Sequence, residues 1–530
     1  MRHQEWTAGC VIEGLRRQSL VGGLVIVLLL VGVLTTAVGM ATELASFRHK
    51  LPDNPNLLRI GELIRSGYIY PDSDRPPYLV TIYGPLFYVL LTIPYRLAQA
   101  AGIAPQVLVR VCIVGALCLC VLLIFLISRR LDSSRQVAWL CALFPVSALP
   151  LWGGGQWMSI RPDFLGLALS LLSVYWFFRS NGRPQAIGAA ICCGLALLLK
   201  LTLFAAPIAI LSWLIYRRRY KEAVLWATGV ALTVVGGYAI VWWREPLMLK
   251  HLAAFLMHPV VVYGQALGFL MQAFSHPVVP FALIGGFLAL QNRTPERVLF
   301  LIYCVVAWLV AIVTIPQVGG GINYFWEPIL ASAVLAGPGL CELQRKAHRT
   351  PILVTAMLFV LLLEWFVPIL WSELYYLRDS YMTAREYQTR KAKWESFVSA
   401  VSGRKLLSPI SAVAILSITP EIPDPFLNAV LELRGQWNSG PVAAQIDAGV
   451  YELIVIGKGA TQARGGYRGV RAWSDGMWEA LKRSYRLACV FEDILEEDLE
   501  VWLPRRGSAE ILPHLTAIGC RSPAVASQTQ

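Results

Sequence analysis

The sequence has little charge for its length. Of its 530 residues only 15% are charged, whereas an ordinary globular protein carries roughly 25%. Hydrophobic residues make up 56%, and the mean hydropathy is +0.57. This excess of apolar residues excludes an intrinsically disordered chain and argues against a soluble multidomain enzyme. The composition is typical of a polytopic membrane protein.

Two kinds of site are missing from the sequence. Its 11 cysteines form no CxxC pair or other metal-binding spacing, and most lie in apolar runs, where cysteine acts as a small hydrophobic residue. The net charge is +13, but no basic patch with interleaved aromatic residues indicates a nucleic-acid groove. Membrane topology explains the charge better, because cytoplasmic loops of membrane proteins gather lysine and arginine.

Long apolar runs predict the membrane spans, since a spanning helix needs about 20 mostly apolar residues. The first run, Leu20–Thr42, follows Arg16 and Arg17. It is too long for a signal peptide and lacks a clear cleavage site after it, so we expect an anchored helix with a cytoplasmic start. Ten further spans are predicted at about Val107–Ser128, Val137–Leu151, Phe164–Phe178, Ala186–Leu199, Thr202–Tyr216, Ala223–Trp243, Val278–Leu290, Val298–Ile315, Trp326–Leu340 and Ile352–Trp371.

The distribution of basic residues sets the orientation. The segments assigned to the cytoplasm carry 17 lysines and arginines, against 4 in the opposite connections after residue 106. The apolar segment Ile82–Ala101 contains Pro85, Pro94 and Arg96, and as a full span it would invert all later spans. We therefore expect it to lie in the outer interface. The prediction is eleven spans, with the N-terminus inside and the C-terminus outside.

The composition changes after residue 371. Close to a quarter of residues 372–530 are charged, Tyr381–Val401 is typical of a helix, and Tyr451–Gly457 and Leu499–Leu503 are typical of strands. We predict a transmembrane catalytic domain over residues 1–371 and a small extracytoplasmic α/β domain over residues 372–530. The second domain has no obvious nucleophile–base constellation, so we expect it to shape access or partner contact and to carry no catalysis of its own.

Cys489 and Cys520 are the only cysteines of that second domain, and they would face an oxidising compartment. The sequence leaves a disulfide and two free thiols both open, because it does not fix the distance between the two Cα atoms.

The first outer loop carries several acids. Glu43 lies where the first span ends, Asp53 follows, and Asp72 and Asp74 precede Tyr83. Between them, residues 57–65 could form an amphipathic helix that ends at a glycine, residue 67. A carboxylate at the membrane–water boundary can serve as a general base, because partial desolvation raises its pKa. The alternative for each acid is a solvated loop residue.

Further polar residues stand at the outer ends of later spans. Arg161 and Asp163 follow three glycines and begin a span; the alternatives are substrate contact or a local ion pair with helix capping. Lys200 lies between two apolar runs; it could hold a lipid-linked phosphate or extend to the interface. A third group, Asn323, Tyr324 and Glu327, follows another glycine triplet, and Glu327 alternatively complements the helix dipole. In the predicted topology all these residues face outward, which indicates an active site at the outer interface.

Taken together, these motifs resemble those of GT-C-fold integral membrane glycosyltransferases, most closely the bacterial family-39-like enzymes related to aminoarabinose and protein O-mannosyl transferases. The resemblance covers roughly residues 20–342. It is carried by the acids Glu43 and Asp53 and by five stretches, Gly67–Pro71, Tyr83–Tyr88, Arg161–Asp163, Lys200–Thr202 and Asn323–Glu327.

The resemblance implies a reaction and roles. Such enzymes transfer a sugar from a polyprenyl-phosphate donor, a first-loop acid deprotonates the acceptor hydroxyl, and basic groups stabilise the departing phosphate. Many members carry a tight acidic pair where this chain has Asp53 and Asn54, so the base stays open between Glu43 and Asp53, with Asp163 next. The expected substrate-binding residues are Arg161, Lys200, Tyr83, Asn323, Tyr324, Glu327, Asp72 and Asp74.

The expected partners are a polyprenyl-phosphate sugar and a lipid, glycan or protein acceptor, in a bacterial inner membrane. A metal-dependent relative, the catalytic subunit of oligosaccharyltransferase, uses acids from several outer loops. No full ligand set of that kind is visible in the sequence, so we expect neither a metal nor another cofactor.

Two other functions stay open at this point. One is a lipid or sugar transporter or flippase, although no internal repeat is visible and the polar residues gather on one face. The other is a structural or assembly protein whose outer domain binds a partner. Sugar transfer to an acceptor would distinguish a glycosyltransferase from both of these alternatives.

Overall fold

A computed structural model describes most of the chain. The described residues are 55–76, 78–131, 133–147, 159–179, 183–256, 263–276, 278–316, 321–347, 389–414, 416–417, 425–433, 435–458, 473–492, 498–506 and 510–522. The predicted spans Leu20–Thr42 and Ile352–Trp371 lie outside them, as does the predicted domain boundary at residue 371.

The chain packs as two compact units. The first combines Val111–Gly237 with Val260–Asp379, and the second combines Glu43–Arg110, Tyr238–Pro259 and Ser380–Gln530. The C-terminal segment therefore shares its unit with the first outer loop and with part of the second long one.

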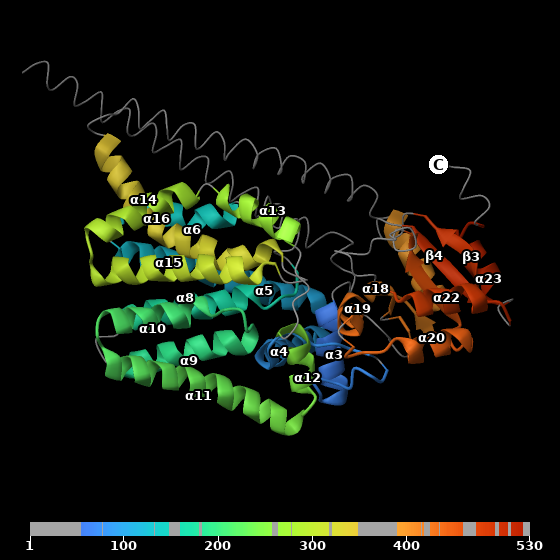
Figure 1. The fold of residues 1–530 in the computed structure, drawn as a ribbon. Helices are drawn as coiled ribbons and strands as arrows, with labels where there is room; N and C mark the ends of the chain where they lie inside the picture. The colour runs from blue at the N-terminus through green and yellow to red at the C-terminus, as the bar shows by residue number, and fades with distance from the viewer. Residues whose placement is uncertain are drawn as a thin grey trace, which may run out of the picture. The chain divides into compact units, whose positions relative to one another are not determined.

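Helices make up the first unit (Figure 1). Every predicted span within the described residues is helical, and the residue types explain it, since leucine and alanine dominate these runs and few helices contain an interior proline. The helices are α5 (Pro105–Arg130), α6 (Arg135–Ser147), α8 (Asp163–Arg179), α9 (Arg183–Leu199), α10 (Ala205–Tyr216), α11 (Tyr220–Arg244), α13 (Tyr263–Phe274), α14 (Val278–Gln291), α15 (Pro295–Thr314) and α16 (Trp326–Ala347), with a short 3₁₀ helix η2 (Ile322–Phe325) before α16.

Three of the described helices, α5, α11 and α15, are long and apolar enough to cross a membrane. A fourth candidate is the pair α13 and α14, which is bent by 69°, and α9 and α10 contain shorter apolar segments. These helices support a membrane protein, while the total of eleven spans stays a prediction.

Close contact between α14 and α16 depends on two glycines. A Cβ atom on Gly285 would lie 1.9 Å from the carbonyl oxygen of Leu335, and one on Gly339 would lie 2.5 Å from that of Phe281. Without side chains at these two positions, the helix backbones can touch, as small residues allow in membrane helix pairs. This contact fixes α16, whose first turn carries Glu327.

In the second unit, α3 (Pro55–Ser66) packs on α4 (Pro85–Ala100). The predicted amphipathic helix is confirmed as α3, and it ends at Gly67, whose φ of +77° is the left-handed C-cap conformation that glycine adopts without strain. The segment predicted for the interface is helical as α4; its place in the membrane stays a prediction. A further helix, α12 (Met248–Leu256), belongs to this unit.

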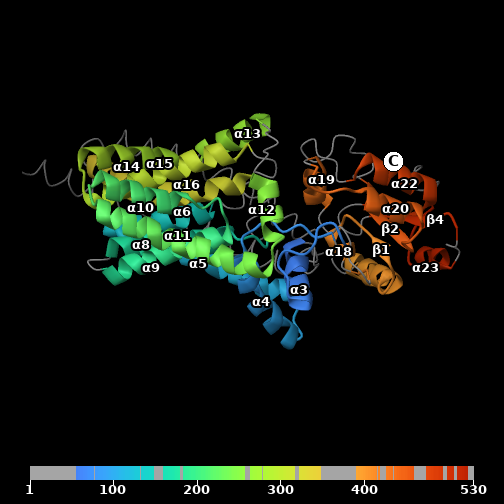
Figure 2. The same ribbon diagram turned by 60° about the horizontal axis from the view of Figure 1, so that its bottom comes forward.

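The C-terminal part of the second unit is a four-stranded sheet with helices (Figure 2). The strand order is β1-β2-β4-β3, in which β1 pairs parallel with β2 and the other pairs are antiparallel. This confirms the predicted strands near 451–457 and 499–503. The elements are β1 (Leu406–Leu407), α18 (Ser411–Ala414), α19 (Pro425–Leu433), α20 (Gly440–Asp447), β2 (Leu453–Gly457), α22 (Asp475–Ser484), β3 (Tyr485–Phe491), β4 (Leu499–Pro504) and α23 (Ile511–Ala517).

Both faces of this sheet are covered. Leu453 and Val455 of β2 point into one hydrophobic core with Phe397 and Leu515, which we call the first core. The alternate residues, Ile454 and Ile456, point into a second core that includes residues of α19, α20 and α22. A strand that is buried on both faces consists of consecutive apolar residues, which explains the sequence LIVIG of β2.

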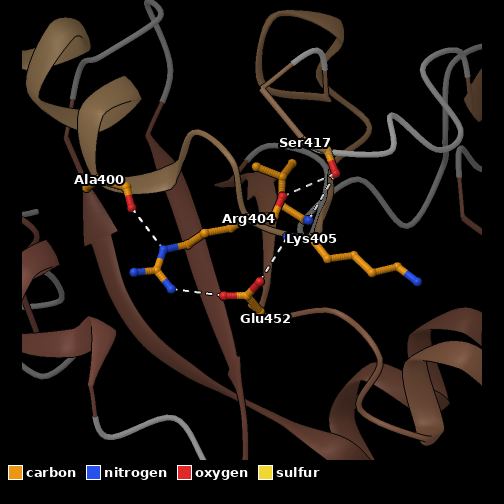
Figure 3. A network of polar contacts seen from close by, with 6 residues as sticks. Ala400, Arg404, Lys405, Ser417 and Glu452 are labelled. Carbon is orange, nitrogen blue, oxygen red and sulfur yellow. Dashed lines mark hydrogen bonds and ion pairs between the residues drawn. The ribbon is translucent and has the colours of Figure 1, made fainter.

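A polar network fixes the start of β1 beside β2 (Figure 3). The carboxylate of Glu452 accepts hydrogen bonds from Arg404 Nη1 at 2.9 Å and from the backbone N–H of Lys405 at 3.1 Å. Ser417 Oγ accepts the N–H of Leu406 at 3.1 Å. Because β1 has only two residues, these contacts hold the edge of the sheet in register.

The structure joins Cys489 and Cys520 in a disulfide, with Cα atoms 5.5 Å apart. Of the two possibilities left open by the sequence, the structure therefore contains the bridge. Beside it, Arg521 and Val490 exchange backbone hydrogen bonds, so the C-terminal segment is tied to β3.

Candidate functional site

A buried ion pair lies at the ends of two helices of the first unit. Asp163 is the first residue of α8 and Lys200 directly follows α9, and they are 2% and 7% exposed. Lys200 Nζ donates to Asp163 Oδ1 at 2.5 Å. Asp163 therefore pairs with a residue 37 positions away in the sequence.

The Gly-rich segment before α16 completes this cluster. Asn323 Nδ2 donates to the same oxygen of Asp163 at 3.1 Å, and Lys200 Nζ lies 4.6 Å from the centre of the Tyr324 ring. Four predicted site residues, Asp163, Lys200, Asn323 and Tyr324, are thus brought together; we call them the Asp163 cluster. Within the described residues, Asp163 Oδ2 and Asn323 Oδ1 are buried without a hydrogen-bond partner, so two oxygen acceptors remain for the donors of a ligand.

Glu327 lies on the next turn and has a different partner. Tyr303 of α15 donates its hydroxyl to Glu327 Oε1 at 3.0 Å, and both side chains are buried. Nearby, Trp326 stacks on Phe164, with ring centres 4.4 Å apart. This stacking fixes the start of α16 against the start of α8, so it positions Glu327 relative to the Asp163 cluster.

Burying ionisable groups among apolar helices costs free energy unless the groups are paired or bind a ligand. Low dielectric strengthens each interaction, and charged residues in membrane helices usually mark a substrate or ion site. The Asp163 cluster combines a cation, a carboxylate, an amide and an aromatic ring, and can therefore bind an anionic group and hydroxyl groups side by side.

The second unit contains another group of the predicted residues, in the first outer loop. Glu245, directly after α11, accepts the backbone N–H groups of Ile69 at 2.7 Å and Tyr70 at 2.6 Å. Burial raises the pKa of Glu245, and these two hydrogen bonds lower it in part. The hydroxyl of Tyr70 donates to the carbonyl of Tyr83 at 2.9 Å. These bonds link the two ends of the segment 69–83.

His251 of α12 forms hydrogen bonds to the same segment at two points. Its Nδ1 accepts the N–H of Thr81 at 3.1 Å, which assigns the ring proton to Nε2, and Nε2 donates to the carbonyl of Pro71 at 2.8 Å. Burial lowers the pKa of His251 to about 4. The imidazole is therefore neutral at pH 7, as its acceptor role at Nδ1 requires.

Asp72 and Asp74 lie in one exposed turn of this segment. Asp72 accepts the N–H of Asp74 at 3.0 Å and pairs with Arg75 at 3.3 Å. Lys250 Nζ lies 2.6 Å from Asp74 Oδ2. Both acids thus have basic partners at the surface, which agrees with the solvated alternative and leaves their substrate contact a prediction.

Sequence reasoning and structure agree on part of the site. Glu43 and Asp53, the two preferred base candidates, lie outside the described residues, and Arg161 lies beside the Asp163 cluster in sequence. The predicted residues that are described fall into two groups on separate units, the cluster with Glu327 and the turn with Tyr83.

Three residues of these groups were not predicted from the sequence: Tyr303, Glu245 and His251. Glu245 and His251 carried a signal, since both lie in the second long outer loop, and Glu245 adjoins the end of a span.

No protein-family model matches the chain. Two curated relatives match part of it. An undecaprenyl phosphate-alpha-4-amino-4-deoxy-L-arabinose arabinosyl transferase of Pseudomonas fluorescens is 31% identical over 155 residues, covering 26% of this chain and 28% of the relative. Its counterpart from Erwinia tasmaniensis is 30% identical over 124 residues, covering 22% of each. The matches therefore span about a quarter of these relatives.

Solved structures match over most of the chain. ArnT from Cupriavidus metallidurans bound to undecaprenyl phosphate has a TM-score of 0.55 at 12% identity, covering 88% of this chain and 97% of that one. The oligosaccharyltransferase AglB from Archaeoglobus fulgidus has a TM-score of 0.51 at 12% identity, covering 87% and 72%. The chain thus has the GT-C fold of these membrane glycosyltransferases, as its motifs predicted.

Proposed function

We propose that this protein is a membrane glycosyltransferase that moves a sugar from a polyprenyl-phosphate donor to an acceptor hydroxyl at the outer face of the bacterial inner membrane. The observation that carries the proposal is the buried Asp163 cluster within a chain of this fold. The names of the two relatives and the undecaprenyl phosphate bound to ArnT support the class of donor.

The reaction needs a base, and we assign it to the first outer loop. A carboxylate, Glu43 or Asp53, takes the proton of the acceptor hydroxyl while the hydroxyl oxygen bonds to the anomeric carbon of the sugar. The bond from that carbon to the phosphate oxygen breaks, and polyprenyl phosphate leaves with the bonding electrons. Asp163 is the next candidate for the base, through Oδ2, because Lys200 and Asn323 already occupy Oδ1.

Lys200 is proposed to stabilise the departing phosphate. Lysine has three N–H donors, and Asp163 accepts one of them. Negative charge on the phosphate grows as the glycosidic bond breaks, so a buried cation stabilises the transition state more than the ground state. Arg161 and Tyr324 are proposed to assist it, and the free oxygens of Asp163 and Asn323 to accept sugar hydroxyls. Asp72, Asp74, Tyr83 and Glu327 complete the proposed substrate-binding set.

We further propose the predicted topology: eleven spans, a cytoplasmic N-terminus and an extracytoplasmic C-terminal domain. The disulfide supports the last point, because structural disulfides persist in oxidising compartments. A reporter enzyme fused after residue 372 should be active outside the cytoplasm; a cytoplasmic signal there would contradict the orientation.

The experiment that tests the function is sugar transfer in membranes that contain the protein, with a panel of radiolabelled polyprenyl-phosphate sugars. We expect label in an acceptor with at least one donor, and loss of that label with Lys200→Ala. Movement of intact donor across the membrane without transfer would favour a flippase instead.

A further inference from the structure

Part of the first outer loop lies inside the C-terminal domain. Tyr78 and Val80 are 2% and 0% exposed and belong to the second core of that domain. They pack there with the buried residues of α19, α20 and β2, more than 300 positions later in the chain. All these residues belong to the second compact unit.

Tyr78 also forms hydrogen bonds with the C-terminal domain. Asn428 of α19 donates its Nδ2 to the carbonyl of Tyr78 at 2.9 Å, and Gln445 of α20 donates its Nε2 to the Tyr78 hydroxyl at 3.2 Å. The Tyr78 ring meets Trp437 edge to face, with centres 6.3 Å apart. Its φ of 56° is rare for a bulky residue and persists only where the surroundings fix the backbone.

The neighbouring residues of the loop contact other parts of the same unit. Arg59 of α3 donates its Nε to the carbonyl of Val80 at 2.6 Å. Thr81 donates its N–H to His251 and its hydroxyl to the carbonyl of Ile69 at 2.9 Å. Tyr78 therefore attaches the segment 78–81 to the C-terminal domain. Val80 and Thr81 attach it to α3 and α12.

We infer that the C-terminal domain is a positioning element for the candidate site, with Tyr78 as its anchor. By holding Tyr78, the domain sets the conformation of the segment 69–83, which carries Asp72, Asp74 and Tyr83. The anchoring is a claim about structure alone; its effect on sugar transfer rests on the proposed function. A shift of about 1 Å in a positioning segment can lower a rate about 10²-fold.

The anchoring is tested by hydrogen exchange on the full-length protein in detergent. Tyr78→Ala and the milder Asn428→Ala should each raise amide exchange across residues 69–83, where the N–H groups of Ile69, Tyr70 and Thr81 are hydrogen-bonded. We expect an increase of at least tenfold for Tyr78→Ala. The matched control is Phe397→Leu, which perturbs the first core on the opposite face of the sheet and should leave residues 69–83 unchanged.

Unchanged exchange over residues 69–83 in both Tyr78→Ala and Asn428→Ala would overturn the anchoring. Equal loosening by Phe397→Leu would also overturn it, because the effect would then follow from general destabilisation of the domain.

Transfer kinetics test the positioning role. We expect Tyr78→Ala to lower kcat at least tenfold while the KM for the donor stays within about twofold, and Phe397→Leu to keep both. A loosened loop with unchanged kcat would overturn the positioning role. If the unaltered protein transfers no sugar at all, the proposed function fails, while the exchange experiment still decides the anchoring.

Discussion

Removing one partner of the Asp163–Lys200 pair should destabilise the first unit strongly. Lys200→Met leaves the Asp163 carboxylate, which is 2% exposed, with the amide of Asn323 as its remaining side-chain partner within the described part of the chain. An uncompensated buried charge of this kind costs about 3–5 kcal/mol. Asp163→Asn leaves the ammonium group unpaired and should cost a similar amount.

The assay is a double-mutant cycle on thermal unfolding of the full-length protein in detergent. We expect the variant with both Asp163→Asn and Lys200→Met to be more stable than the sum of the single effects by about 2 kcal/mol or more, because it buries no unpaired charge. Lys221→Met, at an exposed position of α11, is the matched control and should change stability by less than about 0.5 kcal/mol. Additive single effects would refute the coupling.

Three further predictions address the base, a buried histidine and the disulfide. Glu43→Gln or Asp53→Asn should lower transfer about 10²–10⁴-fold in a folded protein; near-normal turnover in both variants would place the base elsewhere. Because His251 has a pKa of about 4 when folded and 6.5 as its ordinary value, the unfolded chain takes up the extra proton between these values. Stability should therefore fall by roughly 3 kcal/mol as the pH drops from 6.5 to 4, and a pH series of melting temperatures should show a shallower fall in His251→Gln. Mass spectrometry after alkylation without reductant should find neither Cys489 nor Cys520 modified, and two alkylated thiols would exclude the bridge.

The helices of the fold were predictable because membrane spans leave a local signal. Runs of about 20 apolar residues predict a spanning helix without knowledge of its neighbours, and each such run in the described part of the chain is helical. The two predicted strands, Tyr451–Gly457 and Leu499–Leu503, also carried a local signal. The strand β1 did not, because two residues, Leu406 and Leu407, carry no period and depend on the network around Glu452.

The residues of the site were predictable as types, but their pairing was not. The sequence left substrate contact and a local pair of Arg161 with Asp163 both open, and the packing of the helices brings Lys200 to the Asp163 carboxylate. The burial of Tyr78 in the C-terminal domain joins residues 350 positions apart, and no local pattern encodes such a contact. Tyr303 could not be predicted for a related reason: it lies within an apolar run, and the sequence does not indicate that its hydroxyl donates to Glu327.

The measurement that tests the central proposal most directly is transfer of a labelled sugar from a polyprenyl-phosphate donor by the purified protein. We expect a labelled acceptor and released polyprenyl phosphate in equal amounts, and we expect Lys200→Ala to weaken donor binding more than acceptor binding. No transfer from any donor of a full panel by the folded protein, tested with lipid, glycan and protein acceptors, would contradict it.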